Sequence, residues 1–310
     1  MPEWLIERGI GEIRAALVEN GRIVETRLLR EGVIPAGTIL EAKLKSVGRN
    51  AVAVVNTQEY LLPKGAPGIT QGAKLNIEVT REDLGGTEKW KRPLARVSNE
   101  PPRDAPALAG TEVASGKELD EPGWLDLLDE ARSGVIAFPG GELRVSLTPA
   151  MTLIDVDGHL PPGELAIAGA RAAAETIRRH GVGGSIGIDL PTVDGKAIRQ
   201  AAAEAVDAAL PKPFERTSVN GFGFLQIVRP RAHASLFELA DERASFEARA
   251  LLRAAGREVG AIRLAAHPAV ISEFNRKPGW LDQLSRQTGG LIALRSDPSL
   301  AMSAGHAERA

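Results

Sequence analysis

The first hundred residues alternate short runs of Val, Ile and Leu with Gly, Pro and Asn. Two such runs flank Asn20-Gly21, a dipeptide that favours the tight turn of a β-hairpin. Further β-rich runs, including 51–55 and 74–80, follow between residues 35 and 97, with turn residues at close intervals. This pattern predicts an N-terminal β-hairpin followed by a small β-barrel.

The pattern changes after residue 98. Residues 99–118 are rich in Pro, Ala, Asp and Glu, and Pro101, Pro102 and Pro106 interrupt any regular element. We therefore predict a linker there. The chain is predicted to divide into five parts. Residues 1–36 form an N-terminal β segment that packs on the catalytic body, residues 37–98 form the barrel, and residues 99–118 form the linker. Residues 119–231 form an α/β region, and residues 232–310 form a small C-terminal α/β region.

Beyond the linker, apolar residues recur at helical spacing in some segments and in short buried runs in others. The α/β region is predicted to have three helices and five strands (124–133, 166–180 and 196–210; 135–138, 143–147, 151–155, 184–189 and 222–228). The tail is predicted to add two helices and two strands (246–255 and 278–288; 259–264 and 291–294). Strand, helix, strand in this order predicts neighbouring, parallel strands. The polar last dozen residues are predicted to be frayed.

The composition is that of an ordinary globular protein. The chain has 310 residues, 43% hydrophobic and 25% charged, which suits two or three domains and excludes disorder throughout. No apolar run approaches the roughly 18 residues that cross a bilayer, and no signal-like start is present, so we expect a soluble, cytoplasmic protein without a membrane partner. The absence of cysteine excludes disulfides and thiolate zinc sites, so oxygen or imidazole must hold any metal.

Two predicted strands each end in an acid, Asp155 and Asp189. If the strands are adjacent, both carboxylates emerge at one sheet edge, where repulsion favours a bound cation such as Mg²⁺, with Mn²⁺ as an alternative. Asp157, two residues beyond Asp155 on the same side of an extended strand, is placed to hold a bound water. The alternative is structural, because Asp favours strand ends and Asp157-Gly158 is itself a turn dipeptide.

The predicted barrel mixes cations with aromatic residues, as an OB-fold needs in order to bind phosphates and stack bases. The candidate RNA-binding residues there are Lys43, Lys45, Tyr60, Arg81, Lys89 and Lys91. Residues 1–99 carry 15 Lys and Arg against 12 Asp and Glu, whereas the whole chain has a net charge of -2, which argues against binding nucleic acid by bulk charge alone. The alternative is that Tyr60 packs in the core and that the cations line a solvated loop.

Several segments, in order, resemble the catalytic half of the ribonuclease E and ribonuclease G family. They are the opening hairpin, a compressed OB-fold module, the two stretches that end in the acids, the strand after them and the end of the small C-terminal domain (11–25, 37–97, 140–157, 183–189, 220–231 and 294–300). The resemblance implies an α+β or α/β multidomain fold, with a ribonuclease H-like and DNase I-like catalytic region after the barrel. It also implies a magnesium-dependent endoribonuclease that cleaves single-stranded RNA by water attack and leaves 5′-phosphate and 3′-hydroxyl ends.

By this resemblance Asp155 and Asp189 are the metal-binding and catalytic acids, Asp157 stands where the family usually has Asn, and Arg229 matches a family arginine and is a further RNA-binding candidate. The chain also departs from the family. Gly221 replaces an arginine, and the segment that recognises a 5′-monophosphate is missing between barrel and body. The zinc-linking cysteines are absent, so we expect no zinc; a homo-oligomer is allowed but a zinc-linked dimer is not.

The sequence is compatible with three functions. The sequence favours the endoribonuclease, since it keeps both metal acids. A non-catalytic RNA-binding or regulatory relative would explain the departures from the family pattern. A metal-dependent phosphoesterase acting on a small molecule would explain the acids but not the barrel.

Overall fold

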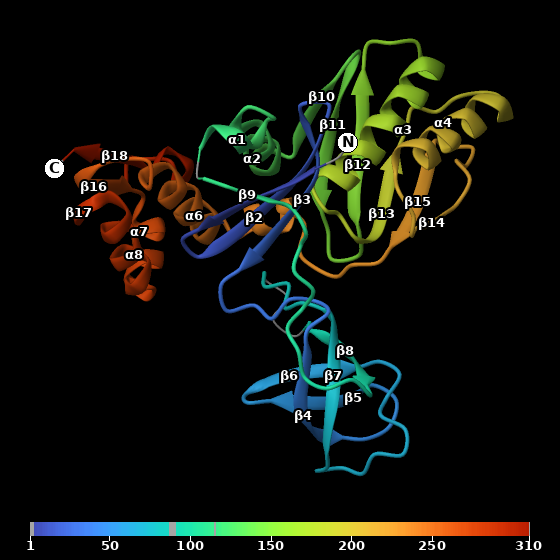
Figure 1. Ribbon diagram of the computed structural model, residues 1–310. Coiled ribbons are helices and arrows are strands. Elements are labelled where there is room, and N and C mark those ends of the chain that lie inside the picture. Colours follow the sequence, from blue (N-terminus) through green and yellow to red (C-terminus); the bar gives the residue numbers. More distant parts are fainter. Residues whose placement is uncertain (1–2, 87–90, 115, 310) are drawn as a thin grey trace.

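The computed structural model describes residues 3–86, 91–114 and 116–309 of the chain. Within these residues the fold is α+β, with three open sheets of four, six and three strands and one closed five-stranded barrel. In Figure 1 the barrel lies at the bottom, the six-stranded sheet at the upper right and the C-terminal region at the left, with the first sheet between them. The predicted combination of a β-barrel with α/β regions is therefore confirmed at this level.

The N-terminal sheet contains the predicted hairpin. Strands β2 (Glu12–Glu19) and β3 (Arg22–Arg30) are joined by Asn20 and Gly21, whose φ angles of 51° and 74° are those of a tight hairpin turn. Strand β1 (Glu3–Gly9) pairs with β2, and β9 (Thr111–Val113) pairs with β1 in parallel. Because β9 lies within residues 99–118, the expectation that no regular element forms there is wrong for these three residues, which add an edge strand to the first sheet.

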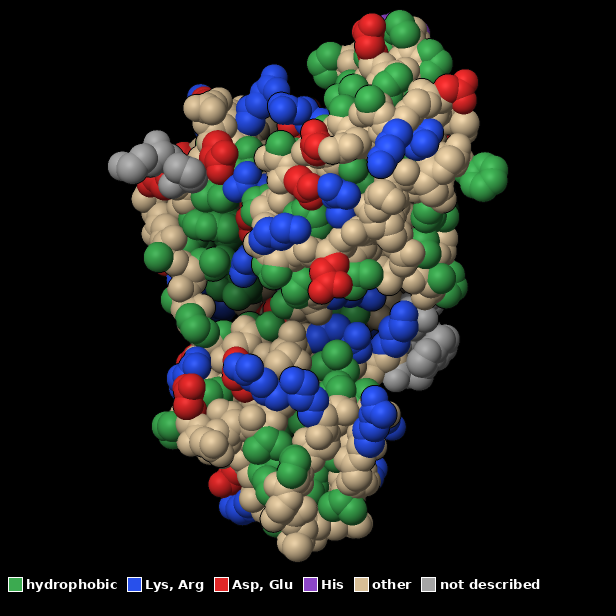
Figure 2. Space-filling model, turned by 90° about the vertical axis from the view of Figure 1, so that its right-hand side faces the viewer, with side chains coloured by type: hydrophobic (Ala, Val, Ile, Leu, Met, Phe, Trp, Pro, Cys, Tyr) green, Lys and Arg blue, Asp and Glu red, His purple; other side chains and the backbone are tan. Residues whose placement is uncertain are grey.

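The barrel comprises five strands in the closed order β4-β5-β6-β8-β7 (Ile39–Ser46, Ala51–Val55, Gln58–Leu62, Leu94–Ser98 and Lys74–Arg81). Alternate side chains such as Leu44, Ala53 and Ile77 are fully buried and form its separate core, as period-two patterning requires. Figure 2 shows the barrel below the rest of the molecule, with Lys and Arg side chains gathered where the two parts meet. The closed barrel is confirmed, and its identification as an OB-fold stays a prediction.

The six-stranded sheet has the order β10-β11-β12-β13-β15-β14 (Val135–Phe138, Gly141–Leu147, Thr152–Gly158, Gly184–Asp189, Phe224–Arg229 and Glu215–Arg216). Its helices are α1, α2, α3 and α4 (Lys117–Asp120, Trp124–Ser133, Pro162–Arg179 and Lys196–Ala209). Helix α3 crosses from β12 to β13, so these two strands are parallel, as predicted. It packs on β10, β11 and β12 with α4 beside it, and so covers one face of the sheet (Figure 1).

Within residues 232–309 the C-terminal region has four helices, of which the last three pack on a three-stranded sheet of order β17-β16-β18. Its elements are α5, α6, β16, α7, α8, β17, a short 3₁₀ turn and β18 (Leu236–Asp241, Arg243–Ala255, Gly260–Ala266, Pro268–Arg276, Pro278–Thr288, Gly289–Ser296, Met302–Ala304 and His306–Arg309). Because β18 pairs with β16, the prediction of a frayed tail is wrong. Backbone pairing with a buried strand orders this polar segment.

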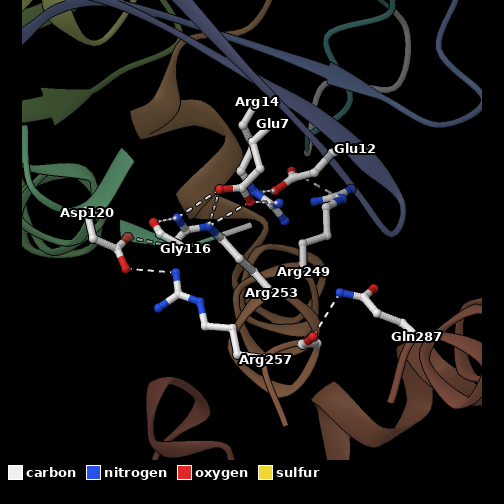
Figure 3. A network of polar contacts seen from close by, with 10 residues as sticks. Glu7, Glu12, Arg14, Gly116, Asp120, Arg249, Arg253, Arg257 and Gln287 are labelled. Carbon is white, nitrogen blue, oxygen red and sulfur yellow. Dashed lines mark hydrogen bonds and ion pairs between the residues drawn. The ribbon is translucent and has the colours of Figure 1, made fainter. Parts of the chain in front are cut away.

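A buried network of charges joins the first sheet to helix α6 (Figure 3). The Glu7 side chain is fully buried; it accepts hydrogen bonds from Arg14 at 2.7 Å and from Arg253 at 2.9 and 3.0 Å. Arg253 also donates to Asp120 at 2.7 Å, and Arg14 lies 2.8 Å from Glu12. Partners separated by more than 200 residues therefore hold the C-terminal region against the N-terminal sheet.

No helix in the described ranges is long and apolar enough to cross a membrane.

Candidate functional site

Four side chains form a row across the middle of the six-stranded sheet. Strand pairing places Arg144 of β11 opposite Asp155 of β12, Asp155 opposite Asp189 of β13, and Asp189 opposite Phe224 of β15. Directly opposed residues point to the same face of a sheet, and neighbouring strands are about 4.8 Å apart. The two predicted acids are therefore nearest neighbours on adjacent strands.

This row lies on the face that α3 leaves open. Along β12, Ile154 and Val156 are buried beneath the helices, whereas Asp155 and Asp157 are exposed on the other side. Along β13, Ile188 is buried and Asp189 is exposed. The predicted shared side of Asp155 and Asp157 is thus confirmed by the alternation.

The expectation that β12 ends at Asp155 is wrong. The strand continues to Gly158, because β11 pairs with it along its whole length, including Glu142 with Asp157. Asp155 therefore lies within β12, whereas Asp189 is the last residue of β13. The carboxylates project from the open face of the sheet and not from its edge.

Charge crowding distinguishes Asp155 from an ordinary surface aspartate. Partial burial, followed by the negative charges of Asp157 and Asp189, raises the pKa of the Asp155 carboxyl. The N–H of Val156 and the guanidinium of Arg144 act in the opposite direction. The part of the rise that comes from Asp157 and Asp189 is the part that a bound cation would relieve.

The carboxylates fit one particular type of metal site. Across residues 3–86, 91–114 and 116–309, no three His, Cys, Asp or Glu side chains are grouped closely enough to enclose a metal ion. Mg²⁺, however, is usually bound through one or two carboxylates, with water and phosphate oxygens completing its octahedron. Asp155 and Asp189 supply two hard oxygen donors beside each other, which suits Mg²⁺ or Mn²⁺.

Arg144 and Phe224 were not identified from the sequence. Arg144 is exposed, and its Nη2 donates to Glu142 Oε1 at 2.6 Å. The alternation Glu142-Leu-Arg-Val-Ser146 already placed Arg144 on the polar side of a strand. Nothing in the sequence, however, indicated which residue of a neighbouring strand it would face.

Of the barrel candidates, Lys43 and Lys45 are exposed along β4, and Lys45 pairs with Glu59. Tyr60 is 2% exposed within the barrel core, and burial raises the pKa of its hydroxyl. A ring so covered offers no face to a base, which corrects the prediction that Tyr60 stacks on RNA. Lys89 lies outside the described residues.

Arg81 and Lys91 line a cavity of about 430 Å³ between the barrel and the six-stranded sheet, together with Arg231. Burial, followed by the charge of Arg231, lowers the pKa of the Arg81 guanidinium. Ser185, near the start of β13, lines the same cavity. Ser185 and Asp189 lie four residues apart on one face, or about 13 Å along the strand. Glu238, which pairs with Arg231, and Asp241 also line this cavity, so its wall carries both signs of charge. The cavity and the carboxylates therefore share the open face of the sheet.

Arg229 lies elsewhere, at the far end of β15. It lines a smaller cavity of about 170 Å³ with Arg27 and Arg178, and donates to the carbonyl oxygen of Val182 at 3.2 Å. Burial is the main cause that lowers the pKa of its guanidinium. The structure thus does not bring Arg229 to the carboxylates, although the sequence placed it among the RNA-binding candidates.

No protein-family model matches the chain, and no curated protein matches it.

Proposed function

We propose that the chain is a magnesium-dependent endoribonuclease that cleaves single-stranded RNA. The observation that carries the proposal is the register of β12 and β13, which sets Asp155 directly opposite Asp189 on an open sheet face. Two exposed carboxylates side by side repel each other unless a cation or a proton is shared between them. Mg²⁺ would be such a cation, and it would also bind an oxygen of the phosphodiester.

In this proposal Asp155 and Asp189 hold the metal, and Asp157 orients a water molecule by accepting a hydrogen bond. Mg²⁺ held there would supply Lewis-acid chemistry, making a coordinated water more acidic and offsetting charge on the phosphate. The water oxygen would form its bond to phosphorus as the bond to the 3′-oxygen breaks; the water would release one proton to solvent, and the 3′-oxygen would take one up from solvent. The products are a 5′-phosphate and a 3′-hydroxyl.

Two further features support RNA as the substrate. The cavity with Arg81, Lys91 and Arg231 opens on the same sheet face as Asp189. Lys43 and Lys45 are further exposed cations on the barrel, of which Lys45 is paired with Glu59. Lys and Arg contacts to phosphates supply most of the affinity of such proteins. The segments that resemble the ribonuclease E and G family include both of the strands that carry the acids.

A non-catalytic RNA-binding protein is the second candidate. It is favoured by Arg144, which is paired with Asp155 in the strand register and whose charge offsets a small part of the rise in the pKa of that carboxyl. A fixed cation at this position compensates part of the carboxylate charge without a metal.

The deciding experiment is cleavage of a labelled single-stranded RNA with and without Mg²⁺, with binding recorded in parallel. We expect Asp155→Asn and Asp189→Asn each to abolish cleavage and to leave RNA affinity within a few-fold, since neither removes a phosphate-binding cation. Asp282→Asn, at an exposed position on α8, is the matched control. Binding without Mg²⁺-dependent cleavage by the wild type would favour the non-catalytic protein instead.

A further inference from the structure

The two outer members of the row, Arg144 and Phe224, flank the carboxylates on either side. From β11 to β15 the row spans three strand spacings, or about 14 Å, with the acids in the middle. A guanidinium and a phenyl ring are the two groups that proteins use most often to contact the phosphate and the base of a single-stranded nucleic acid.

Phe224 is held in place by the glycine beside it. A Cβ atom added to Gly187 would lie 2.5 Å from Cζ of the Phe224 ring and 2.9 Å from Leu153, so the missing side chain makes room for the ring on the open face. Phe224 is partly exposed there, next to Asp189. Its ring is thus both fixed from below and accessible from above.

The backbone just before Phe224 is equally constrained. Asn220 Oδ1 accepts hydrogen bonds from the N–H groups of Phe222 and Phe224 at 2.9 and 3.0 Å. The N–H of Leu190, directly after Asp189, donates to the carbonyl oxygen of Gly223 at 3.2 Å. The Asn220 bonds order the turn before β15, and the bond from Leu190 ties that turn to the end of β13, so the backbone positions of Phe224 and Asp189 are fixed relative to each other.

Arg144 is the matching cation on the other side. Its side chain is 60% exposed and leans toward Glu142, which is itself 37% exposed. An exposed ion pair of this kind is weak and exchanges readily for another anion. A phosphate oxygen next to Asp155 is such an anion, and a guanidinium binds it with two parallel hydrogen bonds.

We propose that Arg144 and Phe224 form a nucleotide subsite, in which a base stacks on the Phe224 ring and Arg144 binds a phosphate of the same RNA strand. The inference rests on the proposed function for the identity of the ligand. It deepens that function by placing the RNA over the open face of the sheet, with the phosphodiester between the two residues and above the acids.

The test for stacking is RNA binding in EDTA, measured by fluorescence anisotropy of a labelled single-stranded oligonucleotide. We expect Phe224→Leu to weaken binding about 5- to 150-fold, which corresponds to the loss of one base stack. Phe224→Tyr keeps the ring and should bind as the wild type does. Phe222→Leu, which alters an 83% exposed ring in the same loop, is the matched control and should bind normally.

An oligonucleotide series with one abasic residue moved along the strand identifies the stacked base. At one position, the missing base should weaken wild-type binding and leave binding by Phe224→Leu unchanged. A loss of affinity with Phe222→Leu and none with Phe224→Leu would overturn the assignment. Thermal unfolding detects a folding defect in Phe224→Leu. If there is one, binding by Phe224→Tyr and wild-type binding to the abasic series decide whether a base stacks on the ring.

The test for the phosphate contact is the salt dependence of binding. Arg144→Gln should reduce the slope of log affinity against log salt by about 0.7, as expected for one phosphate contact on a single strand. Arg286→Gln, at an exposed position on α8, is the control and should leave the slope unchanged. An unchanged slope for Arg144→Gln would overturn this half of the subsite.

These outcomes separate the subsite from the proposed function. Mg²⁺-dependent cleavage that Asp155→Asn abolishes, together with normal binding by the Phe224 and Arg144 variants, would sustain the nuclease and overturn the subsite. RNA binding that depends on Phe224 and Arg144, without cleavage by the wild type, would sustain the subsite and overturn the nuclease. A wild type that binds no RNA would overturn both.

Discussion

Glu7 links the N-terminal sheet to helix α6 through a buried ion pair with Arg253. Its carboxylate is fully buried and receives hydrogen bonds from Arg14 and Arg253, whose side chains are only 2% and 4% exposed (Figure 3). We consider Glu7→Gln, which keeps the size of the side chain but removes its charge. Both guanidinium groups then remain buried, facing a neutral amide that has one acceptor oxygen in place of two.

The size of the expected loss of stability depends on the ion-pair partners that Arg14 and Arg253 keep in Glu7→Gln. Removing one partner of a buried ion pair costs about 3 to 5 kcal/mol, mainly because the remaining charge stays desolvated. Here Arg14 keeps Glu12 at 2.8 Å, and Arg253 keeps Asp120 at 2.7 Å. We therefore expect a loss near the lower limit, about 3 kcal/mol in the free energy of unfolding.

Urea unfolding followed by tryptophan fluorescence measures this loss, and one of the four tryptophans lies at the contact itself. The Arg253 guanidinium lies 5.8 Å from the ring centre of Trp124, which is 1% exposed, so its emission reports on the joint. The control is Glu112→Gln, which breaks the pair between Glu112 and Arg8 on the edge of the same sheet, where both side chains are about 60% exposed. We expect no measurable change for the control. A loss for Glu7→Gln below about 1 kcal/mol would refute the reasoning.

Three further predictions concern the site and the barrel. Because the pKa of Asp155 is raised and metal binding needs its ionised form, the rate of cleavage should fall as the pH drops through that raised pKa. Asp157→Asn removes one of the negative charges that raise the pKa, so the fall in rate should then occur at a lower pH. Tyr60→Ala should destabilise the barrel in urea by about 3 to 5 kcal/mol, as for other buried aromatic residues, while RNA affinity of the folded protein stays unchanged; reduced affinity would restore the stacking role. Gly223→Ala should lower both the melting temperature and the rate of cleavage, because φ of Gly223 is +88° and the added Cβ would lie 2.1 Å from the carbonyl oxygen of Leu190. Gly221→Ala is the control: among the described residues, no atom beyond its two chain neighbours lies within 4 Å of its added Cβ, so neither quantity should change.

The sequence by itself determined the local elements. Asn20-Gly21 specified the first hairpin, and helical spacing gave α2 and α8 at their observed bounds. Alternation along β12 placed Asp155 and Asp157 on one exposed side. Such features were predictable because the partition of each side chain between solvent and core acts over a few residues, and turn chemistry acts on two.

Only the tertiary structure determined which side chains lie next to Asp155 and Asp189. Arg144 and Phe224 are 80 residues apart, and their places on either side of the carboxylates follow from the register of four strands. In this register α3 packs on the covered face, and the space beside Gly187 on the open face is filled by the Phe224 ring. The burial of Tyr60 was decided in the same way, by closure of the barrel. Register and closure depend on contacts between distant segments, which no local pattern of apolar and polar residues encodes.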